Sequence, residues 1–158
     1  MVNTPEELGA WLRLSLTPGV GNESARKLLA AFGPPDRIFA QTESALRQVV
    51  SAAQARHLMG TPDGWTDLSQ DTWAWLQHSP DPAIAHAVVT LGDADYPPSL
   101  LQLPDPPLML YLLGRGAFPS NTALGHTAVG DSATESIAFD VRRSVAIVGS
   151  RRPSRVNV

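Results

Sequence analysis

Residues 149–154 carry the groups in this chain that are best suited to binding phosphate. Two hydroxyls and two guanidinium groups follow a glycine, in the order Gly149, Ser150, Arg151, Arg152 and Ser154. Guanidinium groups offer forked donors that match phosphate oxygens, and a glycine lets the backbone come close to a ligand. The segment lacks the Gly-Lys-Ser/Thr ending of a Walker loop and the three spaced glycines of a dinucleotide fingerprint. The segment therefore predicts an anion-binding site but does not identify the anion. The alternative is a buried strand whose basic end is exposed to solvent.

A run of apolar and β-branched residues at 144–148 precedes these groups. Such a run is typical of a buried parallel strand, and the turn after a strand can deliver amides and cations to one point. In a doubly wound fold this strand would be the first of a domain, with a helix and more strands after it. Because only four residues follow Ser154, the pattern predicts the beginning of such a domain rather than the whole of it.

A second candidate site lies near the N-terminus, where Leu-Thr-Pro-Gly-Val-Gly occupies residues 16–21. The pattern is that of a helix-hairpin-helix motif, in which Gly19 and Gly21 permit a tight hairpin and Val20 anchors it in the helical core. Ala25 would let the second helix approach closely. Free amides at a helix start can bind a DNA phosphate without reading bases. Few cations lie nearby, so a weak backbone contact is predicted, with a tight interhelical turn as the alternative.

The remaining chemistry-bearing residues predict no catalytic, metal or cofactor site. The four histidines are scattered without metal-ligand spacing, at His57, His78, His86 and His126. Three carboxylates lie in expected turns, where such side chains cap backbone amides, at Asp93, Asp95 and Asp105. The tryptophans fall within helical apolar patterns and are expected in the core. No cysteine is present, which excludes disulfides and thiolate sites.

The elements that must position these groups change type near residue 80. Thr4 is the predicted N-cap of a first helix, with Pro5 at its first position and Glu7 completing a capping box. Further helices are expected after Gly21 (ending at Gly33), Pro34, Thr42 and Ser51, and over 66–78. Strands are then predicted at 87–91, at 108–113 (ending at Gly114) and at 144–148, with helical turns near 96–101 and a flexible polar insertion at 116–139.

The charge of the chain is distributed unevenly. Residues 142–158 hold five arginines and no acid, whereas the rest of the chain holds 7 basic and 15 acidic side chains. A cationic end on an acidic body places the expected anion-binding capacity at the C-terminus. Hydrophobic residues make up 43% of the 158 residues, which is typical of a globular protein. No signal peptide or membrane span is recognised, so a cytoplasmic location without membrane contact is expected.

Four segments occur in the order found in the DNA processing protein A family (DprA, also called Smf), which this chain resembles. They are Pro-Gly-Val-Gly at 18–21, Asp-Tyr-Pro-x-x-Leu at 95–100, Asp-Pro-Pro-x-x-Leu-Tyr-x-x-Gly at 105–114, and Val-Ala-Ile-Val-Gly-Ser-Arg-x-x-Ser at 145–154. The resemblance implies a non-enzymatic protein that binds and protects single-stranded DNA and helps to load a RecA-type recombinase during natural transformation. It also implies that Gly149, Ser150, Arg151 and Ser154 belong to the DNA pocket.

The resemblance further implies a mixed α+β and α/β fold in two domains. Residues 1–80 would form an all-helical, sterile-alpha-motif-like domain, and residues 81–158 the start of an extended Rossmann-like domain. The family continues after Ser154 through a Tyr-Gly pair into a helix, whereas this chain reads Arg155-Val156-Asn157-Val158. A truncated domain is therefore expected, without the surface through which the family forms homodimers, and DNA binding should be weak.

Two other functions fit parts of the sequence. A Rossmann-like nucleotide phosphoribohydrolase also begins with a glycine-containing turn after an apolar strand, but its Pro-Gly-Gly-x-Gly-Thr loop is absent here. The helical part alone could instead be a protein-interaction module. The coding sequence beyond codon 158 would distinguish the DNA-binding hypothesis from the phosphoribohydrolase. A pull-down with residues 1–80 would test the interaction module.

Overall fold

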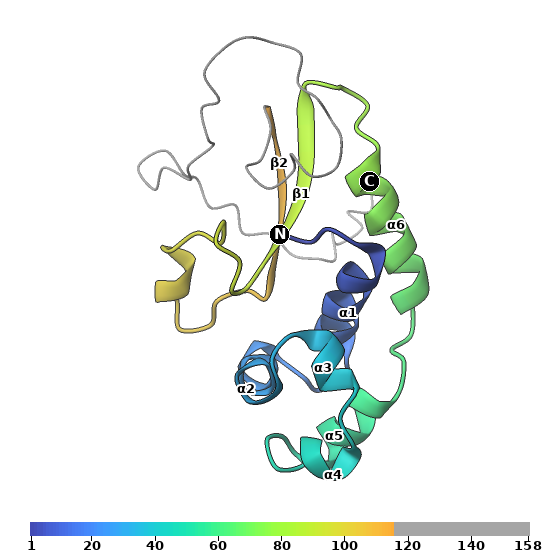
Figure 1. The fold of residues 1–158 in the computed structure, drawn as a ribbon, viewed down its shortest axis with the longest axis vertical. Coiled ribbons are helices and arrows are strands. Elements are labelled where there is room, and N and C mark those ends of the chain that lie inside the picture. The colour runs from blue at the N-terminus through green and yellow to red at the C-terminus, as the bar shows by residue number, and fades with distance from the viewer. Residues whose placement is uncertain (116–158) are drawn as a thin grey trace, which may run out of the picture.

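Six helices precede two strands in residues 1–115, the part of the chain that the computed structural model describes. The helices are α1 (Pro5–Leu16), α2 (Asn22–Phe32), α3 (Pro35–Phe39), α4 (Glu43–Leu46), α5 (Ala52–Met59) and α6 (Trp65–Gln77). The strands β1 (Ile84–Thr90) and β2 (Met109–Arg115) are separated by a short 3-10 helix, η1 (Leu100–Gln102). The fold of these residues is thus a mixed one, with helices first and a small sheet after them (Figure 1).

Local side-chain bonds explain where the helices begin. Thr42 accepts a hydrogen bond from Ala45 N, and the capping box between Ser51 and Gln54 is complete. At α1, Thr4 Oγ1 accepts from Glu7 N at 3.1 Å as predicted. The rest of the predicted α1 capping box is wrong, because the Glu7 carboxylate accepts from the amide of Asn3, at 3.0 Å, and not from that of the N-cap. Glu7 therefore orders the chain one residue before the helix.

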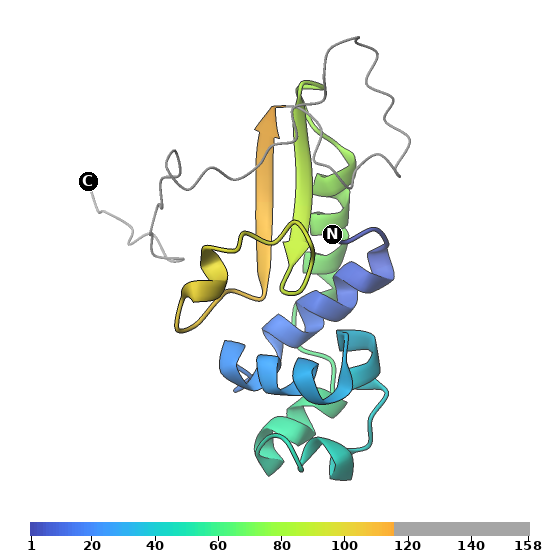
Figure 2. The same ribbon diagram turned by 60° about the vertical axis from the view of Figure 1, so that its left-hand side comes forward.

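The two strands form an antiparallel pair. In its register Val88 lies opposite Tyr111, and Ala85 lies opposite Gly114. The prediction that the second strand ends at Gly114 is wrong, since the ladder continues to Arg115. A glycine weakens a strand without ending it, because its backbone still adopts extended angles and forms ladder bonds. Helix α6 packs along β1 on one side of this sheet, as two views of the fold show (Figures 1 and 2).

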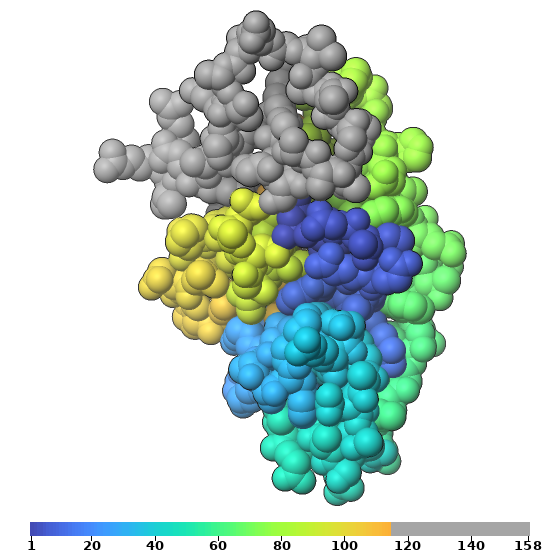
Figure 3. Space-filling model, in the orientation of Figure 1, coloured from blue at the N-terminus to red at the C-terminus, as the bar shows by residue number. Residues whose placement is uncertain are grey.

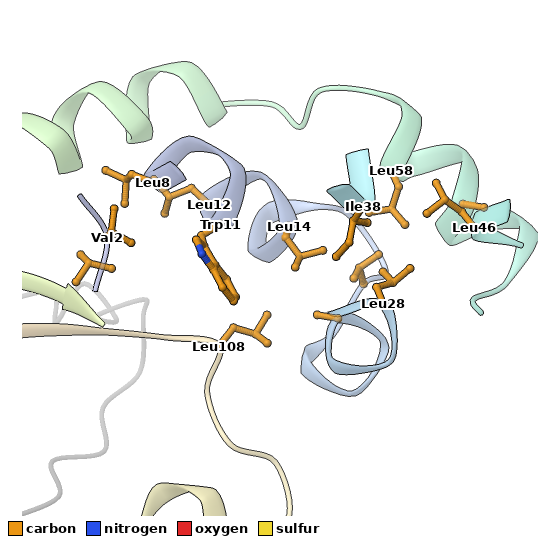
Figure 4. Packing of buried hydrophobic residues seen from close by; sticks show 14 residues of the cluster. Val2, Leu8, Trp11, Leu12, Leu14, Leu28, Ile38, Leu46, Leu58 and Leu108 are labelled. Carbon is orange, nitrogen blue, oxygen red and sulfur yellow. The ribbon is translucent and has the colours of Figure 1, made fainter. Parts of the chain in front are cut away.

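One hydrophobic cluster joins the helices to the sheet. Leu8, Leu14, Leu28 and Ile38 are fully buried in it, and Leu108 enters it from the segment before β2 (Figure 4). Val88 contributes from β1. A smaller cluster on the other face of the sheet contains Ala87, Val89, Tyr96 and Leu112. Alternate strand residues thus pack to opposite faces, as the two-residue period of a strand requires.

Helices α1 and α6 cross closely at a glycine. Trp65 Nε1 donates to Gly9 O at 2.7 Å. A Cβ atom on Gly9 would lie 3.3 Å from Trp65 Cζ2, which is tighter than ordinary van der Waals contact. Glycine at this position therefore permits a backbone approach that a larger residue would obstruct.

The first residues of the chain bind to β1 and to the turn after it. Val2 N donates to Val88 O at 3.1 Å, and the Met1 ammonium lies 2.6 Å from the Asp93 carboxylate. Asp93 also accepts from Thr90 N at 2.7 Å and from Thr90 Oγ1 at 2.9 Å. Burial acts to raise the pKa of Asp93, but the hydrogen bonds from Met1 and Thr90 outweigh it and hold the pKa below its ordinary value. The charged carboxylate is thus favoured in the folded state.

Asp93→Asn should lower the free energy of unfolding at neutral pH by about 1–3 kcal/mol, because the amide cannot reproduce the charged pairing. A carboxyl with a lowered folded pKa stabilises the fold above its unfolded pKa of about 4, and this contribution is lost as the pH falls through the folded pKa. The stabilities of wild type and variant, measured by urea unfolding, should therefore differ at pH 7 and converge as the pH falls below the folded pKa of Asp93. Asp63→Asn, at an exposed turn position, is the control. Equal stability of wild type and Asp93→Asn at pH 7 would contradict this account.

Candidate nucleic-acid interface

The hairpin between α1 and α2 is a type II turn. Thr17 O accepts from Val20 N at 3.1 Å, with Pro18 and Gly19 at the two central positions. Gly19 has φ +76°, the left-handed value that the third residue of this turn requires, and proline sets the angle of the residue before it. Val20 is buried, which confirms its predicted role as the anchor of the hairpin in the helical core.

Helix α2 begins directly after the hairpin without a side-chain cap. Gly21 is the N-cap residue and has no side chain to accept from the first-turn amides. Ala25, in the first turns of α2, has no exposed surface, which agrees with the prediction that a small residue there permits close helix packing. The positive end of the helix dipole and its amides can therefore interact with an anion at this position.

Two side chains of α5 bind the hairpin carbonyls. Gln54 Nε2 donates to Gly19 O at 2.7 Å and to Ser24 Oγ at 2.9 Å. His57 Nδ1 lies 2.8 Å from Pro18 O. The sequence pattern placed His57 at a helix end but did not connect either residue with the hairpin. The capping box at Ser51 fixes where α5 begins, whereas its packing on the hairpin depends on contacts between segments distant in sequence.

The two cations of α2 are paired with acids. Arg26 Nη1 lies 2.7 Å from Asp105 Oδ1, and the other carboxylate oxygen, Oδ2, accepts from Asn22 Nδ2 at 3.0 Å. Lys27 Nζ lies 2.7 Å from Glu23 Oε1. Hydrogen bonds from Arg26 and Asn22 lower the pKa of Asp105. Asp105 was expected to cap a backbone amide in its turn, but its carboxylate binds these two side chains. The hairpin therefore offers amides in preference to free charge.

Asp105 brings the segment before β2 against the helices. Figure 3 shows the residues between β1 and β2 beside α1 and α2 on one face of the molecule. A cleft of about 460 Å³ lies between these parts, with Trp11 and Leu29 among its apolar walls. Arg26 lines it together with two carboxylates, Glu7 and Asp93. Because the acids outnumber the cation, the cleft does not match a polyanion.

His78, His86 and the tryptophans have structural roles, and His126 lies outside the described residues. His78 is the C-cap residue of α6 and contacts Ala74 O. His86 is buried and stacks on Trp75 with ring centroids 4.2 Å apart. Trp11 is buried, and the remaining tryptophans are partly buried against the main cluster, which confirms the predicted core role. Trp75 of α6 thus packs against both strands, on His86 of β1 and Tyr111 of β2.

The predicted site residues fall into two groups. Gly19, Val20 and Gly21 are brought together in the hairpin. The predicted residues of the basic turn lie outside the described residues; they are Gly149, Ser150, Arg151, Arg152 and Ser154. The strand predicted at 144–148 and the insertion predicted at 116–139 lie outside them as well. Within residues 1–115, no group of three or more acidic or histidine side chains is placed to hold a metal ion. None of the helices described is long and apolar enough to cross a membrane.

Comparison with protein-family models, with curated proteins and with solved structures yields no match to this chain.

Proposed function

We propose that this chain binds single-stranded DNA in the manner of the DNA processing protein A family, with the 17–21 hairpin as one backbone contact. The observation that carries the proposal is the combination of a glycine-containing type II turn with an uncapped start of α2. The ordered series of motifs in the sequence supports the same family. Its members' role, protection of single strands and delivery to a RecA-type recombinase, is proposed here too, and it requires binding rather than catalysis.

Binding at the hairpin would be independent of base sequence. Backbone amides and the α2 dipole attract a phosphate oxygen without contacting base edges. Because Arg26 and Lys27 are paired with acids, this contact alone would be weak. The main electrostatic contribution is assigned to Arg151 and Arg152, beside Gly149, Ser150 and Ser154. Such cations neutralise phosphates and make affinity strongly dependent on salt.

The finer fold assignment is part of this proposal. The helices up to α6 correspond to a sterile-alpha-motif-like unit that contains a helix-hairpin-helix. The β1–β2 pair would be the antiparallel margin of a Rossmann-like sheet, to which residues 144–148 add a parallel strand. Helix α6 already supports this two-stranded sheet on one side, and an added strand would extend the sheet at its edge.

Titration of a fluorescently labelled single-stranded oligothymidine tests the proposal. At low salt the wild-type chain should bind the single strand in preference to a duplex. Arg151→Ala combined with Arg152→Ala should weaken binding about 5- to 20-fold and reduce the salt slope by about 1.4, since each lost phosphate contact to a single strand changes the slope by about 0.7. Arg47→Ala with Arg56→Ala, at exposed positions of the helical part, removes equal charge and should change affinity less. An unchanged affinity in the Arg151/Arg152 variant would refute the site.

A further inference from the structure

We propose that α5 acts as a clamp that sets the hairpin conformation, with Gln54 and His57 as positioning residues for phosphate binding. This inference rests on the proposed DNA contact at the hairpin. Neither residue belongs to the hairpin or to α2, and both reach it from a helix that follows two intervening helices. These two side chains form hydrogen bonds with consecutive peptide carbonyls, those of Pro18 and Gly19.

Two carbonyl groups of the turn are bound by side chains of α5. A carbonyl oxygen carries partial negative charge and repels phosphate, whereas an amide attracts it. Pro18 O is bound by His57 Nδ1 and Gly19 O by Gln54 Nε2, at 2.8 and 2.7 Å. Both carbonyls of the tight turn are therefore directed toward α5 and satisfied there. An anion that approaches from another side does not face either of them.

The contacts of the Gln54 side chain fix its orientation. Its Oε1 accepts from Ser51 N at 3.0 Å, and its Nε2 donates to both Gly19 O and Ser24 Oγ. Gly19 O can only accept, so the nitrogen of the amide must face it. One side chain thus joins the turn at Gly19 to the first turn of α2 at Ser24. Their relative position decides where the α2 amides lie with respect to the hairpin.

His57 completes the clamp on the preceding carbonyl. Because Pro18 O accepts only, His57 Nδ1 must carry a hydrogen. The neutral Nδ1–H tautomer and the imidazolium both satisfy this condition. Because this hydrogen bond is exposed, it contributes little to the free energy of unfolding. Its main effect is to hold the conformation of the turn.

Substitutions of Gln54 separate clamping from helix capping. Gln54→Glu retains an oxygen that can accept from Ser51 N, but it has no donor for Gly19 O or Ser24 Oγ. His57→Ala removes the other donor. Gln48→Glu is the matched control, since Gln48 is exposed between α4 and α5 and the change introduces the same charge. All three variants should fold, because the substituted side chains lie outside the buried core.

Hydrogen exchange of the Val20 amide reports the clamp independently of DNA, because this amide closes the turn on Thr17 O. Gln54→Glu and His57→Ala should each accelerate its exchange about 3- to 10-fold, as expected for one or two lost hydrogen bonds, and should weaken oligothymidine binding by a similar factor. Gln48→Glu should change neither. Wild-type exchange in both variants would overturn the clamp. Faster exchange with unaltered DNA affinity would overturn the role of the clamp in positioning a phosphate contact. If DNA binding were lost only on substitution of Arg151 and Arg152, the clamp would be refuted and the proposed DNA-binding function would stand.

Discussion

Leu14→Ala is expected to lower the free energy of unfolding by about 3–4 kcal/mol, near the middle of the range for a fully buried leucine truncated to alanine. Leu14 has no exposed surface, and its side chain extends from α1 toward Leu28 and Ile38 of the main cluster (Figure 4). The removed atoms lose their burial, and the cavity that remains is walled by helices whose backbone bonds resist collapse. Urea unfolding monitored by circular dichroism measures the loss.

Leu103→Ala provides the control for this experiment. Leu103 is 46% exposed in the segment before β2, so its truncation should cost less than about 1 kcal/mol. If Leu14→Ala changed stability no more than Leu103→Ala did, α1 would not pack on α2 and α3 as described. A large loss confined to Leu14 would confirm that its side chain is packed between these helices.

Gly9→Leu is expected to be nearly as destabilising, by about 2–3 kcal/mol, through overpacking rather than a cavity. A single carbon on Gly9 would already lie 3.3 Å from the Trp65 ring, and leucine adds three more carbons in the same crossing. Helix α6 must move away, and the bond from Trp65 Nε1 to Gly9 O would lengthen or break. Thermal unfolding followed by circular dichroism should show a midpoint lowered by about 10 °C or more.

Gly9→Ala separates the steric cause from helix propensity. Alanine favours a helix interior by about 1 kcal/mol over glycine, but its Cβ makes the tight contact with Trp65, so the two effects should nearly cancel. Ala30→Leu, on an exposed position of α2, is the control for added volume and should leave the midpoint nearly unchanged. A Gly9→Leu variant as stable as wild type would show that α1 and α6 are not in close contact.

The helices could be predicted because the information that determines their ends is local. Thr42, Ser51 and Gly33 act on backbone groups within the same turn, and each has the predicted effect. The bounds of β2 were less predictable, because strand pairing depends on a partner elsewhere in the chain. Gly114 continues the strand since Ala85 lies opposite it, and no residue adjacent to Gly114 indicates that pairing.

In the candidate site, too, the local turn could be predicted from the sequence, whereas the contacts between distant residues could not. The spacing of Pro18, Gly19 and Gly21 specifies a tight turn before a helix, which the structure contains. The contact of Arg26 with Asp105 joins residues 79 positions apart, and nothing near either residue identifies the other. The binding of Gln54 to the hairpin is equally non-local. The role of the basic turn at 149–154 stays a prediction.

The pairing of the N-terminal residues with β1 has a consequence for folding during synthesis on the ribosome. Helices α1 to α5 make many of their contacts with near neighbours in sequence, and such contacts can form as the chain emerges. Val2 and Met1 precede these helices in the chain, and they must wait for Val88 and Asp93 before their bonds can close. These two residues should therefore become ordered later than α1 to α5. A pause in translation before residue 88 would leave the side chain of Val2, which is buried in the fold, accessible to chaperones.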